Sequence, residues 1–95
     1  MLEVTGPARV TLLGEGRRVS PRSADAVAGT VRLVLDEPVV PGALLMVEWE
    51  DTDVLGEASS CERTQQGFTV TMKVEHTLVG TIELARLARK LLEAS

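Results

Sequence analysis

Residues Asp25 to Leu35 read DAVAGTVRLVL, and the second half of this sequence has the period of two that a pleated strand imposes. Apolar side chains at the odd positions from Val31 to Leu35 fall on one side of that strand. The first half is short and consists of small and polar residues, with Gly29 as its flexible point. We therefore expect a loop that leads into a buried strand, and we expect any ligand site at their junction.

The same alternation recurs along the chain between turns marked by glycine and proline. It is clearest from Phe68 to Glu75, where apolar and polar residues alternate without a break, so that one face is core and the other is water. Gly56 interrupts a less regular run and indicates a bulge or close packing. The predicted strands are residues 8–13, 17–20, 31–35, 43–49, 54–63 and 68–75.

The period changes near Thr77, and the residues from Thr81 to Glu93 are strong helix formers without glycine or proline. Five apolar residues cover one wide arc of this predicted helix and charged residues cover the other. We expect a single mainly β domain over residues 1–95: a small antiparallel six-stranded β-barrel over about 8–76, then a C-terminal helix over about 79–93 that covers an open end or edge of the sheet. The apolar arc consists of Leu84, Leu87, Ala88, Leu91 and Leu92.

Composition excludes several classes of function. The net charge of −4 and the presence of only two aromatic residues, Trp49 and Phe68, argue against a nucleic-acid-binding protein. Cys61 is the single cysteine, so no intrachain disulfide forms, and we expect a small core side chain there. No apolar run approaches the roughly 18 residues of a membrane span, and residues 1–10 lack the layout of a signal peptide. We expect a cytoplasmic protein without membrane insertion.

Nothing in the sequence indicates catalysis or a cofactor. His76 is the only histidine, so neither a zinc site nor a histidine-supported nucleophile is available. The acidic run from Glu50 to Asp53 lacks the glycine and the distal glutamate of an EF-hand, and we expect it to be a solvated hairpin connection. No phosphate-binding loop or dinucleotide fingerprint occurs. We therefore expect a protein that is not an enzyme and holds neither metal nor cofactor.

Three segments together resemble the PilZ domain, a small bacterial β-barrel that binds cyclic dimeric GMP. VRLVLDEPVVPGALLMVEWE resembles the central run of that family, DVLGEASSC resembles its strand with small residues, and GFTVTMKVEHTL followed by a helix resembles its final strand and helix. The resemblance covers roughly residues 8–78. It implies the barrel fold and a regulatory role in cyclic dimeric GMP signalling.

The ligand signature of the family has two parts, R-x-x-x-R on an arm before the first strand and D/N-x-S-x-x-G before the next strand. The resemblance places Asp25 on the acidic position of the second part, with Val27 in place of serine and Thr30 in place of glycine. The spacing of the first part occurs at Arg18 and Arg22, next to Arg17, but lies only three residues before Asp25. Guanidinium groups suit phosphates and stack on bases.

Two hypotheses follow from this resemblance. In the first, ligand binding is weakened or lost and the domain works through a protein partner or self-association, on the C-terminal helix or on a sheet face. In the second, the domain is a working receptor for cyclic dimeric GMP that uses Arg18, Arg22 and Asp25. The alternative for the three arginines, including Arg17, is a solvated loop cluster. The missing serine, glycine and N-terminal arginine arm favour the first hypothesis.

Overall fold

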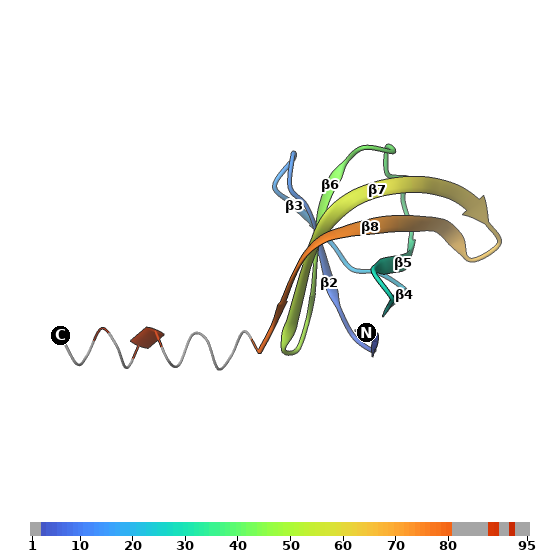
Figure 1. Cartoon of the computed structure of the whole chain (residues 1–95). Helices are drawn as coiled ribbons and strands as arrows, with labels where there is room; N and C mark the ends of the chain where they lie inside the picture. Colours follow the sequence, from blue (N-terminus) through green and yellow to red (C-terminus); the bar gives the residue numbers. More distant parts are fainter. Residues whose placement is uncertain (1–2, 81–87, 90–91, 93–95) are drawn as a thin grey trace.

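One curled antiparallel sheet forms the described part of the chain (Figure 1). The computed structural model describes residues 3–80, 88–89 and 92. The strands follow one another across the sheet in the order β1-β4-β5-β8-β7-β6-β2-β3, so β1 and β3 are its two edges and the sheet is open. The strands are β1 (Glu3–Thr5), β2 (Arg9–Leu12), β3 (Arg17–Val19), β4 (Ser23–Val27), β5 (Thr30–Leu35), β6 (Leu44–Trp49), β7 (Thr52–Thr64) and β8 (Gly67–Val79).

The long hairpin of β7 and β8 joins the two halves of the sheet. Each of its two strands has 13 residues. Strand β5 pairs with β8 on one side of the hairpin, and β6 pairs with β7 on the other. The pairing of β7 with β8 shifts at Leu55/Gly56 and again at Ala58/Ser60. Such bulges increase the local twist of a strand pair, and the hairpin bends strongly along its length (Figure 1). The bulge expected at Gly56 is therefore confirmed.

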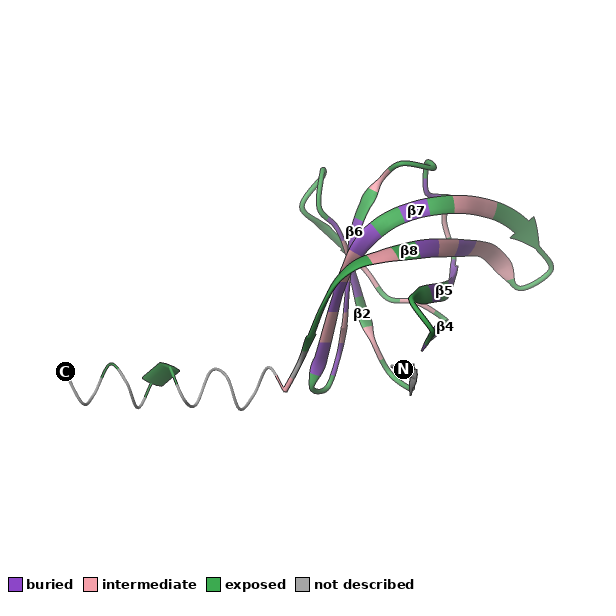
Figure 2. Ribbon diagram, in the orientation of Figure 1, coloured by how far each residue is buried: buried purple, intermediate pink, exposed green. Residues whose placement is uncertain are grey.

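The concave face of the sheet holds the core. Alternation along each strand sends every second side chain to this face, as the colour changes along the ribbon show (Figure 2). Aliphatic residues fill it because the chain has so few aromatic ones, and β-branched valine packs well on a pleated surface. Its fully buried large side chains are Val10, Val31, Leu33, Leu35, Leu45, Val47, Val54, Val70 and Met72.

The segment from Asp25 to Leu35 is a β-hairpin rather than a loop that leads into a strand. Residues 23–27 form β4, which pairs with β5 from Val27↔Thr30 to Ser23↔Val34. Ala28 and Gly29 are the two turn residues, and both have positive φ, 51° and 82°. Positive φ at both central positions is typical of the type I′ turn, whose twist matches the flanking strands. The expectation of a loop was wrong because β4 has only five residues and mostly small side chains, so its sequence carries little strand signal.

Other expectations need correction as well. Residues 3–80 form eight strands where the sequence predicted six, because β4 and the edge strand β1 were missed. The β6–β7 turn consists only of Glu50 and Asp51, whereas Thr52 and Asp53 belong to β7. Strand β8 continues to Val79, beyond the expected barrel end near residue 76. The helix expected over 79–93 lies almost entirely outside the described residues.

Candidate functional site

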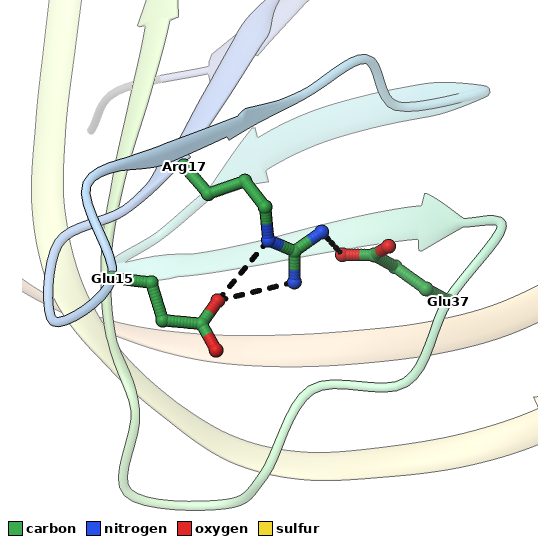
Figure 3. A network of polar contacts seen from close by, with 3 residues as sticks. All are labelled: Glu15, Arg17 and Glu37. Atoms are coloured by element: carbon green, nitrogen blue, oxygen red, sulfur yellow. Dashed lines mark hydrogen bonds and ion pairs between the residues drawn. The ribbon is translucent and has the colours of Figure 1, made fainter.

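Arg17 of β3 is held by two carboxylates (Figure 3). Its Nε and Nη2 atoms donate to Oε2 of Glu15 over 3.2 and 3.1 Å, and its Nη1 atom donates to Glu37. The hydrogen bond to Glu37 is the largest cause that raises the pKa of Arg17, and the hydrogen bonds to Glu15 are the next largest. Three of the guanidinium contacts that a phosphate would use are thus already made within the chain.

Arg22 has an acidic partner too. It lies between β3 and β4, its backbone N–H donates to the carbonyl of Val34 over 2.7 Å, and its Nε atom donates to Oδ1 of Asp36 over 2.5 Å. Both side chains of this ion pair are exposed, at 61% and 66%. The backbone contact fixes Arg22 beside β5 at the start of β4, and the ion pair orients its guanidinium toward the end of β5.

Arg18 is separated from Arg17 by the pleat of β3. Successive residues of a strand point to opposite faces, and Arg18 pairs with Thr11 of β2 whereas Arg17 pairs with Leu12. Arg18 is exposed, and among the residues that the structure describes no ion pair to it is found. The adjacent arginines therefore do not form one cationic surface.

Asp25 lies on β4 and faces Arg32 of β5 in the strand register. It lines two open hollows. One, of about 520 Å³, lies over the hairpin and is lined by Asp25, Val27, Thr30 and Arg32. The other, of about 300 Å³, is lined by Asp25 and Arg22 together with residues 6–8, 21 and 23–24.

Two of the four site residues expected from the sequence thus share a hollow. Arg22 and Asp25 lie together there, whereas Arg17 lines a different hollow, of about 290 Å³, with Val39, Leu44 and others. Arg18 lines none of these. Val27 and Thr30 flank the two turn residues and line the hairpin hollow together with Asp25. The hollow therefore has an apolar side chain where the PilZ signature has serine, and a hydroxyl group where that signature has glycine.

An apolar band on the convex face was not predicted. We call Leu44, Met46, Leu55 and Leu78 the outer stripe. Leu44 and Met46 alternate with buried residues of β6, and Met46 lies opposite Leu55 of β7. On β8, His76 lies opposite Leu55, and Leu78 lies two pairs further along, opposite Asp53. Leu44 and Leu78 are each 50% exposed, and the other two are half-buried. The signal was present as apolar residues at outward positions of the predicted strands.

Acidic groups border the outer stripe. Glu48 and Asp53 face each other across β6 and β7, and Arg9 lies opposite Glu48 on β2. Burial is the largest cause that raises the pKa of Asp53, followed by the negative charges of Glu48 and Asp51. A cation placed beside the stripe would relieve this crowding of carboxylates.

A third region lies at the end of the sheet next to Trp49. A hollow of about 650 Å³ is lined there by residues 7–9, Ser20 and 48–50. The Nε1 atom of Trp49 and the Oγ1 atom of Thr11 are buried without a hydrogen-bond partner. Buried polar groups are normally paired, and of these two residues only Trp49 lines the hollow.

In the part of the chain that the structure describes, no group of three or more His, Cys, Asp or Glu side chains could hold a metal ion. Cys61 is half-buried, packs against the core and accepts a hydrogen bond from the Val39 N–H at a distance of 3.5 Å. It is thus a small side chain packed on the core, as expected from the sequence. Within the described ranges, none of the helical residues belongs to a helix long and apolar enough to cross a bilayer.

Comparison with known proteins gives no assignment. No family model matches the chain, no curated protein matches its sequence and no solved structure matches its fold.

Proposed function

We propose that the chain is a noncatalytic PilZ-like regulatory module of bacterial cyclic dimeric GMP signalling, in which ligand binding is weakened or lost and protein contact is the working role. The proposal rests on the resemblance over residues 8–78 and includes its small barrel and C-terminal helix. The curled antiparallel sheet is compatible with it. The cytoplasm is the proposed location.

The observation that carries the loss of ligand binding is the pairing of the arginines. A guanidinium that binds phosphate needs free donors, but Arg17 donates to Glu15 and Glu37, and Arg22 donates to Asp36. A phosphate would have to displace carboxylates that belong to the same chain. The separation of Arg17 from Arg18 by the pleat further weakens a shared phosphate site.

The observation that favours protein contact is the outer stripe. Its residues lie on consecutive strands and half of each terminal leucine is exposed. Scattered exposed apolar residues are ordinary, whereas a contiguous band is typical of an interaction surface. A sheet face is one of the two surfaces on which we expect a protein partner to bind, the other being the C-terminal helix.

The second candidate is a working receptor for cyclic dimeric GMP that uses Arg18, Arg22 and Asp25. One observation favours it: Arg22 and Asp25 line the same hollow. Calorimetric titration of the full chain with cyclic dimeric GMP separates the candidates. The proposal expects no saturable heat up to about 1 mM ligand, which corresponds to a binding free energy of roughly −4 kcal/mol at most.

Saturable heat at micromolar ligand would overturn the loss of binding. The matched variants are then Arg22→Gln and Arg63→Gln, because Arg63 is an exposed arginine at the far end of β7. Loss of the heat in Arg22→Gln alone would establish the receptor. Equal loss in both variants would indicate attraction by overall charge.

A further inference from the structure

We propose that the hollow beside Arg17 is a docking groove for a segment of a partner protein in which an apolar side chain lies next to a lysine or an arginine. We call this hollow, of about 290 Å³, the end groove; it lies between the β2–β3 turn and the β5–β6 connection, at one end of the sheet (Figure 1). The inference deepens the proposed protein contact by naming a surface and the chemistry of its partner, and it rests on that function. The apolar residues that line the end groove are Leu12, Pro38, Val39, Val40, Ala43 and Leu44.

The end groove has a buried apolar floor and an exposed apolar rim. Leu12 and Val39 belong to the core and also line the groove. Val40 and Leu44 line it as well, and they are 76% and 50% exposed. Leu13, which is 41% exposed, lies beside Leu44, because its backbone N–H donates to the Leu44 carbonyl over 3.0 Å. An apolar side chain placed in the groove would therefore contact the core and cover apolar surface that is exposed to water.

Backbone hydrogen bonds hold both walls of the end groove. In the β5–β6 connection, the Gly42 N–H donates to the Ala58 carbonyl over 2.8 Å, and the Ala58 N–H donates to the Ala43 carbonyl over 2.9 Å. In the β2–β3 turn, the Gly16 N–H donates to the Leu12 carbonyl over 2.8 Å. A surface that is already ordered in the free protein loses less conformational freedom when a partner binds.

The charge at the rim selects a cationic partner. Glu15 and Arg17 line the groove, and Glu37 precedes its lining residue Pro38. Two carboxylates and one guanidinium give this cluster one net negative charge (Figure 3). Arg17 uses one oxygen of each carboxylate, and within the described residues the other oxygens, Oε1 of Glu15 and Oε2 of Glu37, accept no hydrogen bond. A lysine or arginine can donate to these oxygens, whereas an acidic partner would meet like charge. The net charge of −4 acts in the same direction.

The size and the position of the end groove indicate a polypeptide as its occupant. Its volume of about 290 Å³ lies at the lower limit for pockets that enclose a small-molecule ligand, roughly 300 Å³. Leu44 belongs both to the end groove and to the outer stripe, so a segment anchored in the groove can continue over apolar surface along β6 toward Met46. A chain of several residues uses both surfaces, whereas a small molecule fills only the groove.

The test begins with a library of random peptides displayed on phage, selected against the immobilised full chain. We expect enriched sequences in which an apolar residue lies within two positions of a lysine or arginine. An enriched peptide is then synthesised and titrated by calorimetry into the chain and its variants. Val40→Ser should weaken binding by about tenfold or more, as expected for the loss of an apolar anchor. The matched control is Val27→Ser, because Val27 is also exposed but lies in the hairpin hollow. Circular dichroism shows whether each variant keeps its sheet.

A double-mutant cycle tests the charge contact. Glu15→Gln combined with Glu37→Gln should weaken binding of the peptide by about tenfold, and replacing the basic residue of the peptide by glutamine should weaken binding to the parent chain similarly. The glutamine peptide should then bind the parent and the double variant equally, which shows that the two changes remove one interaction. Glu50→Gln combined with Glu75→Gln is the control with the same change in net charge, at exposed positions away from the end groove.

Several results would overturn the inference. These are the absence of any enriched sequence, enrichment of acidic sequences, and equal loss of binding in Val40→Ser and Val27→Ser. Self-association of the chain that Val40→Ser weakens would make a second copy the occupant instead. Peptides that lose binding in Leu78→Asp but not in Val40→Ser would remove the end groove and leave the protein-contact role on the outer stripe standing. The proposed function fails separately, through micromolar binding of cyclic dimeric GMP.

Discussion

Asp25 of β4 lies directly opposite Arg32 of β5, two pairs away from the turn made by Ala28 and Gly29. This relationship places the residue most like the family's acidic position inside a regular hairpin. Its backbone groups are therefore committed to the sheet, and only its side chain faces the hairpin hollow. Opposite charges at facing positions contribute a few tenths to about 1 kcal/mol to strand pairing.

The turn of this hairpin gives the first prediction. Ala28 has a φ of 51°, a conformation that costs a residue with a Cβ atom about 1 kcal/mol and that asparagine tolerates better. Ala28→Asn should raise the free energy of unfolding by roughly 0.5 to 1 kcal/mol. Gly29→Ala should lower it by about 1 kcal/mol, because Gly29 has a φ of 82°. Urea denaturation measures both, and a stabilising Gly29→Ala would contradict the turn.

The second prediction concerns Gly56 at the bulge of β7. A Cβ atom there would lie 2.1 Å from the backbone oxygen of Lys73 and 2.9 Å from Cε of Met72. Because a backbone atom of the neighbouring strand cannot move aside cheaply, Gly56→Ala should cost about 2 to 4 kcal/mol.

Gly14 provides the control for this substitution. A Cβ atom added to Gly14 would meet nothing within 4 Å, and its φ is not positive. Gly14→Ala should therefore leave the stability unchanged or raise it by up to about 1 kcal/mol, since alanine restricts the unfolded chain. Similar losses in the two variants would show that Gly56 is not closely packed against β8.

The third prediction concerns the carboxylates around Arg17. Glu15→Gln combined with Glu37→Gln should lower the unfolding temperature only slightly, because the side chains of this network are 36% to 62% exposed. The difference from the parent should shrink in about 1 M salt, where charges are screened within about 3 Å. Thermal unfolding at low and high salt measures it. A large, salt-independent loss would mean that these side chains also pack the fold.

The same double variant tests the pairing argument for ligand binding. Without its two carboxylate partners, Arg17 has donors free for an anion. The heat of binding measured by calorimetry with inorganic phosphate or cyclic dimeric GMP should therefore be at least as large as that of the parent chain. If carboxylate pairing is what weakens anion binding, the heats grow. Unchanged absence of binding would place the cause in the hairpin hollow, with Val27 and Thr30.

The sequence predicted the long, regular strands well and the short, small ones poorly. The run from Phe68 to Glu75 lies within β8, and its strict alternation left no other reading. β4 reads SADAV, in which two buried alanines carry little apolar signal, and only pairing with β5 and β1 makes it a strand. The type I′ turn was hidden because Ala28 stands where asparagine or aspartate usually marks it.

The candidate site was predictable only in part for a similar reason. The sequence spacing of Arg18 and Arg22 indicates that they lie close together. The pleat of the strand, however, separates Arg17 from Arg18. The acidic partners of Arg17 and Arg22 lie up to 20 residues away in the chain. The partners Glu37 and Asp36 belong to the segment after β5, which the curl of the sheet brings back toward β3. Contacts of this kind depend on tertiary structure and have no local signature.

The fourth prediction concerns Asp53. Its pKa in the folded chain is raised above the ordinary value of 3.8 by burial and by the charges of Glu48 and Asp51. The folded state then binds more protons than the unfolded state between these two pKa values, so this group lowers stability as the pH rises through that window. The charged groups that face it are Glu48, Asp51 and, beyond Glu48, Arg9.

Asp53→Asn should therefore be more stable than the parent chain at neutral pH, with a difference that disappears as the pH falls below 3.8. Urea denaturation at a series of pH values measures the difference, and subtracting the parent curve removes the effect of the other carboxylates. Glu48→Gln removes the second cause and should shift the window of the parent downward without abolishing it. A variant that is less stable than the parent at neutral pH would show that ionised Asp53 has a cationic partner.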